Sequence, residues 1–333
     1  MEDYIFNDFS EMVETELNRR LDSAESEEEK DTIIQAFNSM DYSGPLMEMI
    51  DLTTNQAVKD IVKARFEISQ NYRAEENQFL ANQLHKWNRG FTASEMLLSI
   101  SLDFIDDLRE YVDDLQDEDK NEAIYVYVAM TYLFSRASQQ YLEVLSLCKG
   151  GLADGAMARW RSLYELAIIT SFITENGEET AKAFIDAAYS LDHYDWAKAS
   201  GQFSKKGRLF FKDIEKKCTF DTVSFTEPYN TACLAVHPSA QGTFQRIGLY
   251  DNSVIPTGRT DYGIDYPAKL AAITFSQIVI MFLSVYSSAT NTCMIKTIAD
   301  LIPFVIDEYE WCFDNIIWDD IDDDSEIITE NGV

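Results

Sequence analysis

Residues 91–115 read FTASEMLLSISLDFIDDLREYVDDL, and this stretch decides the fold class. Its apolar side chains recur at steps of three and four residues: Leu97, Ile100, Phe104, Leu108, Tyr111 and Leu115. Because an α-helix turns once in about 3.6 residues, this spacing places them along one helical face. The stretch is therefore predicted to be an amphipathic helix with one buried side.

The rest of the chain continues this pattern. Further helices are predicted over 53–87, 121–149, 153–174, 178–200, 229–237, 267–291 and 303–318. The sequence contains only 13 Gly and 6 Pro in 333 residues, too few for a fold with many tight turns. These features predict an all-α protein, a multi-helix bundle. Residues 242–267 differ. They are rich in Gly and Pro and contain a short alternating segment, residues 245–250, so they are predicted to form an ordered loop or a small β-hairpin.

Three parts are expected along the chain. Residues 1–65 form an appended acidic helical segment, and residues 66–300 form the helical core. Residues 301–333 form a terminal helix and an acidic tail. No repeat of fixed period is present in the sequence.

The formal net charge is −31, and no basic residue follows Lys296. Such a charge repels nucleic acid and anionic membranes at long range, so nucleic acid is a disfavoured partner. A local basic patch can still act within a Debye length of roughly 8 Å. The simplest interpretation is a solubilising surface. Two alternatives are a tail that docks on a basic protein partner and a protein that mimics nucleic acid.

The sequence favours a cytoplasmic protein of bacterial type. The amino-terminal residues MEDYIFNDF lack the basic and apolar regions of a signal peptide. The apolar stretch 270–285 contains Thr, Ser and Gln and falls short of the roughly 18 apolar residues of a membrane span, so a buried core helix and no membrane are expected. Five Cys without a C-x-x-C pair argue against a disulfide framework or a thiolate zinc site.

Motifs of the common enzyme classes are absent from the sequence. It contains no G-x-x-x-x-G-K-[ST], G-x-G-x-x-G, G-x-S-x-G or H-E-x-x-H. None of the three His lies three residues after a Glu, as di-iron carboxylate bundles require. No cofactor and no metal site are therefore expected, and whether the protein is an enzyme is left open.

The stretch GLADGAMARWRSLYE, residues 151–165, carries the first candidate site. Arg161 and Glu165 are one helical turn apart on a face that Ile168 and Phe172 continue. Because an isolated buried charge is costly, the two are expected to pair or to line a cleft. Two interpretations follow: a structural salt bridge that fixes the helix register, and a functional polar site.

The stretch YNTACLAVHPS, residues 229–239, carries the second. Tyr229, Cys233 and His237 recur every four residues, and His237 precedes a proline. A His at a helix carboxyl terminus interacts favourably with the helix dipole, which is the structural interpretation. A His is also able to act as acid or base near neutral pH, which is the functional one.

Basic residues gather in one place, between residues 205 and 217. Lys205, Lys206, Arg208, Lys212, Lys216 and Lys217 alternate there with Phe203, Phe210 and Phe211. Such a cluster can bind a single-stranded nucleic acid, because the cations contact its phosphates and the aromatic rings stack on its bases. Neutralisation of the acidic tail, within one chain or between subunits of a homo-oligomer, is the favoured alternative.

These motifs, together with GRTDYGIDYPAKLAAITFSQI at 258–278, resemble a bacterial family filed as domain of unknown function 5677. The resemblance runs from about Leu84 to Ala289. It implies a helical fold and characteristic polar positions at Arg161, Glu165 and His237. Tyr164 stands where relatives often carry His, and Cys233 where Ser is common. A more distant analogy links the chain to HEPN helical bundles, whose signature of Arg followed by His within one helix is absent before each His here.

The leading functional hypothesis is a defence or stress effector whose polar pocket acts on RNA or a nucleotide. Arg161, Glu165 and His237 are the candidate catalytic residues, with His237 as acid or base and Arg161 stabilising phosphate charge. The candidate binding residues are Tyr164, Tyr229, Lys205, Lys206 and Arg208. The rival hypotheses are a non-catalytic interaction module that uses its acidic tail and a nucleic-acid mimic.

Overall fold

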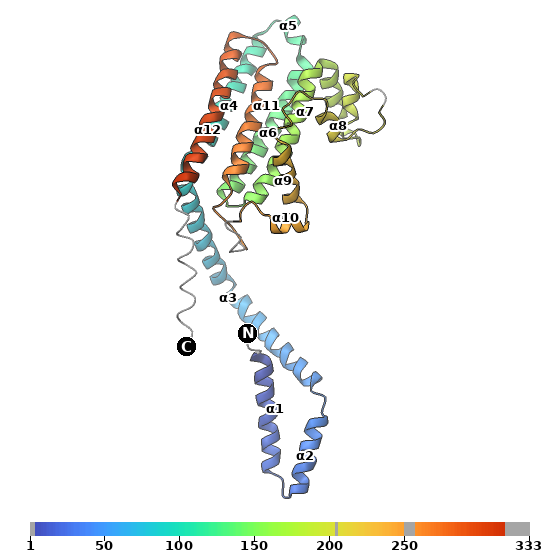
Figure 1. Cartoon of the computed structure of the whole chain (residues 1–333), viewed down its shortest axis with the longest axis vertical. Coiled ribbons are helices and arrows are strands. Elements are labelled where there is room, and N and C mark those ends of the chain that lie inside the picture. The colour runs from blue at the N-terminus through green and yellow to red at the C-terminus, as the bar shows by residue number, and fades with distance from the viewer. Residues whose placement is uncertain (1–3, 204–205, 250–256, 317–333) are drawn as a thin grey trace. The chain divides into compact units, whose positions relative to one another are not determined.

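The computed structural model describes residues 4–203, 206–249 and 257–316 (Figure 1). Every regular element in these ranges is a helix, which confirms the all-α prediction. The chain divides into two compact units between Asn77 and Gln78. This boundary falls inside the long helix α3 (Ser43–Lys86), which also contains the predicted boundary after residue 65.

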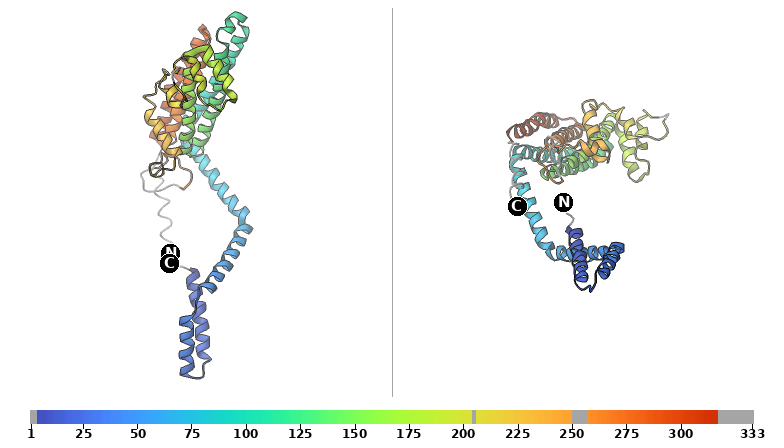
Figure 2. Two further views of the ribbon diagram at one scale, coloured as in Figure 1. Left: turned by 90° about the vertical axis from the view of Figure 1, so that its right-hand side faces the viewer. Right: turned by 60° about the horizontal axis from the view of Figure 1, so that its bottom comes forward.

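The first unit contains a helical hairpin. Helices α1 (Tyr4–Asp22) and α2 (Glu27–Ser39) pack side by side (Figure 2). Phe9 and Phe37 are its buried residues. Ser26 caps α2 by accepting a hydrogen bond from the amide of the third residue after it, at 3.2 Å.

The second unit is a bundle built around α11 (Asp265–Leu283), which packs against four other long helices. These are α4 (Asn88–Asp114), α6 (Ile124–Lys149), α7 (Ala153–Asp186) and α12 (Ala289–Asn315). In α11, Phe275 stacks on Tyr141 at a centroid distance of 4.6 Å, and the Thr274 hydroxyl accepts a 3.0 Å hydrogen bond from the Trp160 indole. All four side chains are fully buried, so this helix forms the centre of the core.

Helices α11 and α12 are long and apolar enough to cross a membrane, by length and composition alone. The prediction that residues 270–285 fall short of such a span therefore does not hold on those criteria. Of the apolar window of α11, 67% is buried inside the bundle, whereas only 22% of that of α12 is buried. The burial of α11 is the pattern of a core helix, as the sequence predicted.

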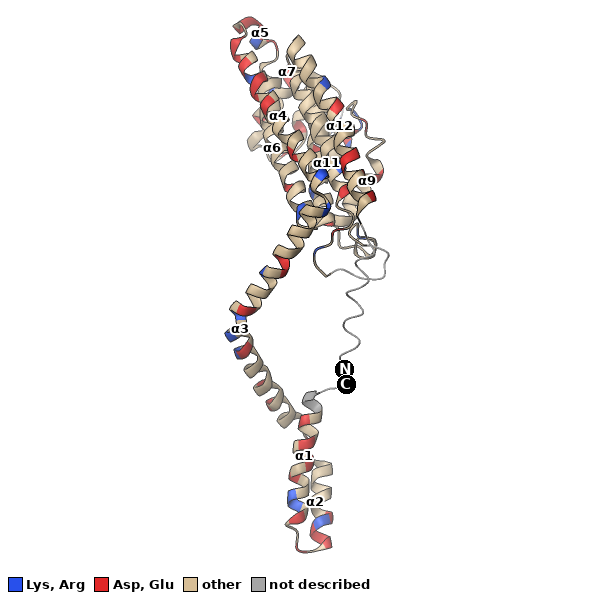
Figure 3. Ribbon diagram, turned by 90° about the vertical axis from the view of Figure 1, so that its left-hand side faces the viewer, with Lys and Arg blue, Asp and Glu red and all other residues tan. Residues whose placement is uncertain are grey.

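Charge is distributed unevenly over the bundle. Figure 3 shows Asp and Glu along α4 and the short α5 (Asp117–Asn121) at one end. The second half of the terminal helix α12 is also acidic and carries no basic residue after Lys296. The predicted acidic tail, residues 319–333, lies outside the described residues.

A layer of shorter helices covers the face of α7 that points away from the bundle core. It consists of η2 (Asp195–Ser200), α8 (Phe211–Glu215) and α9 (Thr226–Val236). The η1 turn (Ala187–Tyr189) joins α7 to this layer, and α10 (Ala240–Phe244) follows α9. The predicted helix end at Gly177 is a kink with φ of 69°, after which α7 continues to Asp186. Where α9 packs on α7, the candidate residues Arg161 and Glu165 of α7 meet Tyr229 of α9.

In the region predicted as a loop or hairpin, α10 is followed by irregular backbone at the described residues 245–249 and 257–264, and α11 begins at Asp265. Residues 250–256 lie outside the description. The Asp154 carboxylate accepts the amide of Ile247 at 3.0 Å, and Arg259 donates to the carbonyl of Gly150 at 2.7 Å. These contacts tie the segment to the start of α7, so the ordered-loop alternative describes the observed residues.

Candidate functional site

The site is built on α7, where Arg161 and Glu165 lie one turn apart. Arg161 Nε is 3.1 Å from Glu165 Oε1, and the two side chains are 27% and 30% exposed. The pair is therefore formed as the spacing predicted, but it is only partly buried. Partial exposure reduces both the desolvation penalty and the energy of the pair, so a buried structural salt bridge describes it poorly.

Tyr229, on the covering helix α9, contacts both members of this pair. Its hydroxyl donates to Glu165 Oε1 at 2.9 Å, and the Arg161 guanidinium lies 5.2 Å from the centroid of its ring. Burial, and then the negative charge of Glu165, raise the pKa of Tyr229 well above its usual value. The hydroxyl therefore stays protonated and acts as a hydrogen-bond donor at neutral pH.

A second half of the network is centred on α8. Tyr164 donates to Glu215 Oε1 at 3.1 Å, and Lys212 Nζ lies 2.8 Å from Glu215 Oε2. Lys212 also lies 4.6 Å from the centroid of the Tyr229 ring, which packs on the Tyr164 ring at 5.3 Å. The two halves therefore form one continuous network of two cations, two carboxylates and two tyrosines.

Two members of this region were missed by the sequence reasoning. Glu215 follows Lys212 by three residues, a spacing that suggests a helical ion pair but not a contact with Tyr164. Tyr194 precedes η2, and its pKa is raised by burial and then by the negative charge of Glu165. No local sequence signal marked Tyr194.

His237 is not part of this network. It is the exposed carboxyl-terminal cap of α9, eight residues beyond Tyr229. At a rise of 1.5 Å per residue, that separation is about 12 Å along the helix axis. In the described part of the chain no contact joins His237 to Arg161 or Glu165. The structure therefore brings Arg161, Glu165 and Tyr229 together, but it does not place His237 in the predicted pocket with them.

The basic region predicted at 205–217 borders the same layer. A hollow of about 370 Å³ opens there, lined by Gln202, Phe203, Lys206, Asp213, Lys216 and Lys217. Lys206 pairs with Asp213, and the charge of Lys216 also interacts with this carboxylate. Lys216 and Lys217 are exposed, and neither forms a direct salt bridge among the described residues. Arg208 lies over the ring of Phe210 at 5.6 Å. Lys205 lies outside the described residues.

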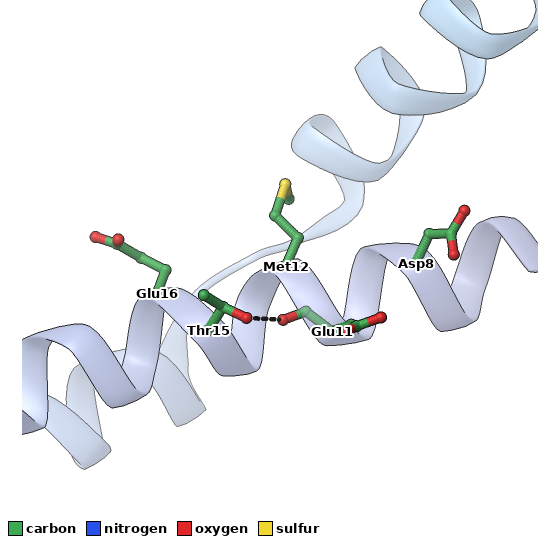
Figure 4. Close-up of a pocket in the computed structure, with 5 residues that line it drawn as sticks. All are labelled: Asp8, Glu11, Met12, Thr15 and Glu16. Atoms are coloured by element: carbon green, nitrogen blue, oxygen red, sulfur yellow. Dashed lines mark hydrogen bonds between the residues drawn. The ribbon is translucent and has the colours of Figure 1, made fainter.

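Two other hollows differ in character. One lies on a single helix, α1, and is lined by Asp8, Glu11, Met12, Thr15 and Glu16 (Figure 4). One helix forms its wall, so it does not enclose a ligand. The other, of about 620 Å³, lies where α6 meets the end of α7 and is mostly apolar, with Phe184, Trp196 and His193 in its lining. Neither contains the predicted polar residues.

Metal-binding and disulfide chemistry have no support in the described ranges. No group of three His, Cys, Asp or Glu side chains there is placed to hold a metal ion. The five cysteines are free thiols, and Cys148 and Cys312 are buried. Burial raises the pKa of the half-buried Cys218 to about 11, so this thiol is protonated and weakly reactive at neutral pH.

Residues 127–227 match a family described as a family of unknown function, DUF5677. The predicted family is therefore confirmed over this segment, which is narrower than the predicted 84–289. It spans α6 to the start of α9 and includes Arg161, Tyr164, Glu165 and Glu215, while Tyr229 and His237 follow it. Neither the curated proteins nor the solved structures gave a significant match to the chain.

Proposed function

We propose that the segment belonging to the DUF5677 family, together with α9, binds a phosphate-bearing ligand, an RNA strand or a nucleotide, on the surface around α8. The observation that carries this proposal is the gathering of cations on one small surface of a protein with net charge −31. These cations are Arg161, Lys206, Arg208, Lys212, Lys216 and Lys217. Glu165, Asp213 and Glu215 pair with three of the six, so an excess of positive charge remains.

The exposed members of this surface suit phosphate. Lys216 and Lys217 border a hollow and are exposed, and neither forms a direct salt bridge among the described residues, although the charge of Lys216 interacts with Asp213. Phe210 is 59% exposed beside Arg208, and an exposed aromatic ring provides a face on which a base can stack. The negative field of the whole protein acts against nucleic acid at long range, so the attraction is local and falls with added salt.

Arg161 gives this surface a deeper contact point. Its guanidinium has five N–H donors, and its contacts with Glu165 and Tyr229 use only part of them. The side chain remains 27% exposed, so an anion can reach part of it. A phosphate bound there would lie beside the protonated Tyr229 hydroxyl.

The binding test uses labelled single-stranded RNA and fluorescence anisotropy. Replacing both Lys216 and Lys217 by Ala removes two cations, so the affinity should fall by about tenfold or more and depend less on salt. Lys296→Ala is the matched control, because Lys296 is 76% exposed on α12 and pairs with Asp300. An unlabelled mononucleotide is added as a competitor. It should displace the RNA if the site binds a nucleotide, and it should not if the site binds a strand. Equal affinity of the double variant and the wild type would refute the proposal.

We place hydrolysis, with His237 as acid or base, on the same surface. His237 lies about 12 Å along α9 from Tyr229, so a substrate that reaches both is an extended strand rather than a single phosphate. His237→Ala should therefore bind RNA normally and fail to cleave it. If the wild-type protein binds RNA without cleaving it, the catalytic part is wrong and the binding part stands.

A further inference from the structure

Helix α3 carries unusual apolar exposure between residues 43 and 77. Every residue from 51 to 60 is exposed. The large apolar side chains that are more than half exposed are Met47, Leu52, Val58, Ile61, Val62, Phe66, Ile68 and Tyr72. A helix in water gains little stability from its backbone alone, and exposed apolar patches of this size mark interaction surfaces.

The spacing of this surface identifies the kind of partner. Steps of three and four residues link Met47, Ile50, Thr54, Val58, Ile61, Arg65, Ile68 and Tyr72 into one line, called here the α3 seam. Apolar residues at this spacing pack against a second helix as in a coiled coil. Val62 lies directly beside the seam. The partner is therefore a helix that runs along α3.

The polar residues of the α3 seam determine the direction of pairing with a second copy. A parallel pair in register would place Arg65 against Arg65 of the second copy, and the two like charges would repel. An antiparallel pair centred between Lys59 and Asp60 instead places Arg65 beside Thr54 of the second copy. The same centre places Val58 beside Ile61 and Met47 beside Tyr72, so apolar residues meet apolar residues.

Charges beside the α3 seam agree with the antiparallel arrangement. Glu48 and Arg73 lie on the same side of the helix, near its two ends. Antiparallel pairing about this centre brings Glu48 of each copy level with Asn71 of the other, about 3 Å along the axis from Arg73, so two opposite-charge pairs form within side-chain reach. Parallel pairing would place like charges at the same level.

We propose that residues 43–77 pair in antiparallel orientation with the same segment of a second copy of this protein. Six exposed side chains lie on or beside the α3 seam: Met47, Val58, Ile61, Val62, Ile68 and Tyr72. At about 100 Å² each, two copies bury roughly 1,200 Å², which reaches the lower bound of a stable interface. The pairing joins two binding surfaces of the kind proposed above, but it does not depend on that function.

Sedimentation of the full chain tests the pairing. The wild type should have twice the mass of one chain, and Ile61→Asp should have the mass of one. Ala74→Asp, which lies away from the α3 seam, should remain a dimer. Circular dichroism and the melting temperature check that both variants keep the bundle, to which Ile61 does not belong. A monomeric wild type, as expected if other helices of the same chain or a different protein cover the seam, would overturn the proposal, as would a dimeric Ile61→Asp.

Cysteine cross-linking tests the direction. In a Cys293→Ser background, Met47→Cys chains and Tyr72→Cys chains are oxidised separately and as a mixture. The mixture should form a disulfide-linked dimer, while each variant alone should not. Cross-linking of either variant alone indicates parallel pairing and would overturn the antiparallel arrangement.

Discussion

At the scale of residues, the central feature is that polar groups from three helices satisfy one another. Glu165 accepts from Arg161 and Tyr229, and Glu215 accepts from Tyr164. Hydrogen bonds to charged acceptors contribute more than neutral ones, about 1.5–3 kcal/mol each. Partial exposure lets water replace a lost partner, so the cost of removing one group lies below that of a fully buried pair.

The Arg161–Glu165 pair offers a direct test of this exposure. A fully buried pair would cost about 3–5 kcal/mol when one partner is removed. With both side chains about a third exposed, we expect Arg161→Ala and Glu165→Ala to cost about 1–2 kcal/mol each, since water solvates the survivor. The coupling energy from the double variant should be about 0.5–1 kcal/mol. Urea unfolding measures all three, and a coupling above about 3 kcal/mol would show that the pair is effectively buried.

The tyrosines predict a loss of stability at high pH. Burial, followed by negative neighbours, raises the pKa of Tyr266 to about 12 and that of Tyr286 to about 12, and the pKa of Tyr164 and Tyr229 rises further. In the unfolded chain a tyrosine ionises near pH 10. The stabilisation is therefore complete below about pH 10 and is lost as the pH rises toward and beyond 12.

The measurement is the free energy of unfolding in urea between pH 8 and 12, with tyrosinate absorbance followed in parallel. The free energy should be constant up to about pH 9.5 and fall above it. Tyrosinate absorbance should show a group of tyrosines that ionises later than a free tyrosine does, above about pH 10. A free energy that stays constant to pH 12 would contradict the raised pKa values.

At the scale of elements, glycines end or bend the helices for two different reasons. Gly151 precedes α7 with φ of +67°, and a Cβ there would lie 2.5 Å from the Phe79 ring and 2.6 Å from the Thr260 carbonyl oxygen. Gly177 bends α7 with φ of +69° and has nothing within 4 Å of a Cβ. Backbone conformation demands glycine at both positions, and close packing demands it only at Gly151.

This matched pair of glycines separates backbone strain from steric clash. Gly177→Ala should cost about 1–3 kcal/mol, because φ of 69° with ψ of −158° is a backbone conformation that essentially only glycine adopts. Gly151→Ala also makes the new methyl group clash with the Phe79 ring and the Thr260 carbonyl, which cannot both move away. It should therefore cost at least about 2 kcal/mol more than Gly177→Ala. Urea unfolding of both variants gives the comparison. Equal costs would mean that Phe79 and the 260 segment adjust freely to the new side chain.

At the scale of the whole molecule, the two units differ in how they are stabilised. The buried core from Trp87 to Cys312 belongs to residues 78–316, whereas the hairpin of α1 and α2 buries little more than Phe9 and Phe37. Most of the hydrophobic stabilisation therefore belongs to the second unit. The proposed phosphate-binding surface also belongs entirely to that unit.

A chain of residues 78–333 should consequently fold by itself. We expect one cooperative unfolding transition with a melting temperature within about 5 °C of the full chain, since no residue of its core is removed. RNA binding by this shorter chain should match that of the full chain at low protein concentration, where pairing through α3 contributes little. Loss of cooperative unfolding would show that the first unit supports the bundle.

The sequence by itself determined the features that depend on neighbours along the chain. Helical spacing predicted the all-α class and the pairing of Arg161 with Glu165, and Gly150-Gly151 marked the end of α6, because each depends on residues within one or two turns. Only the tertiary structure decided which helices meet. It joined Tyr229 to Glu165 and Tyr164 to Glu215, and it left His237 at the exposed end of α9, since contacts between distant segments depend on how helices pack rather than on local spacing. The cations around α8 were visible in the sequence, but the packing of α8 on α7 brings them beside Arg161.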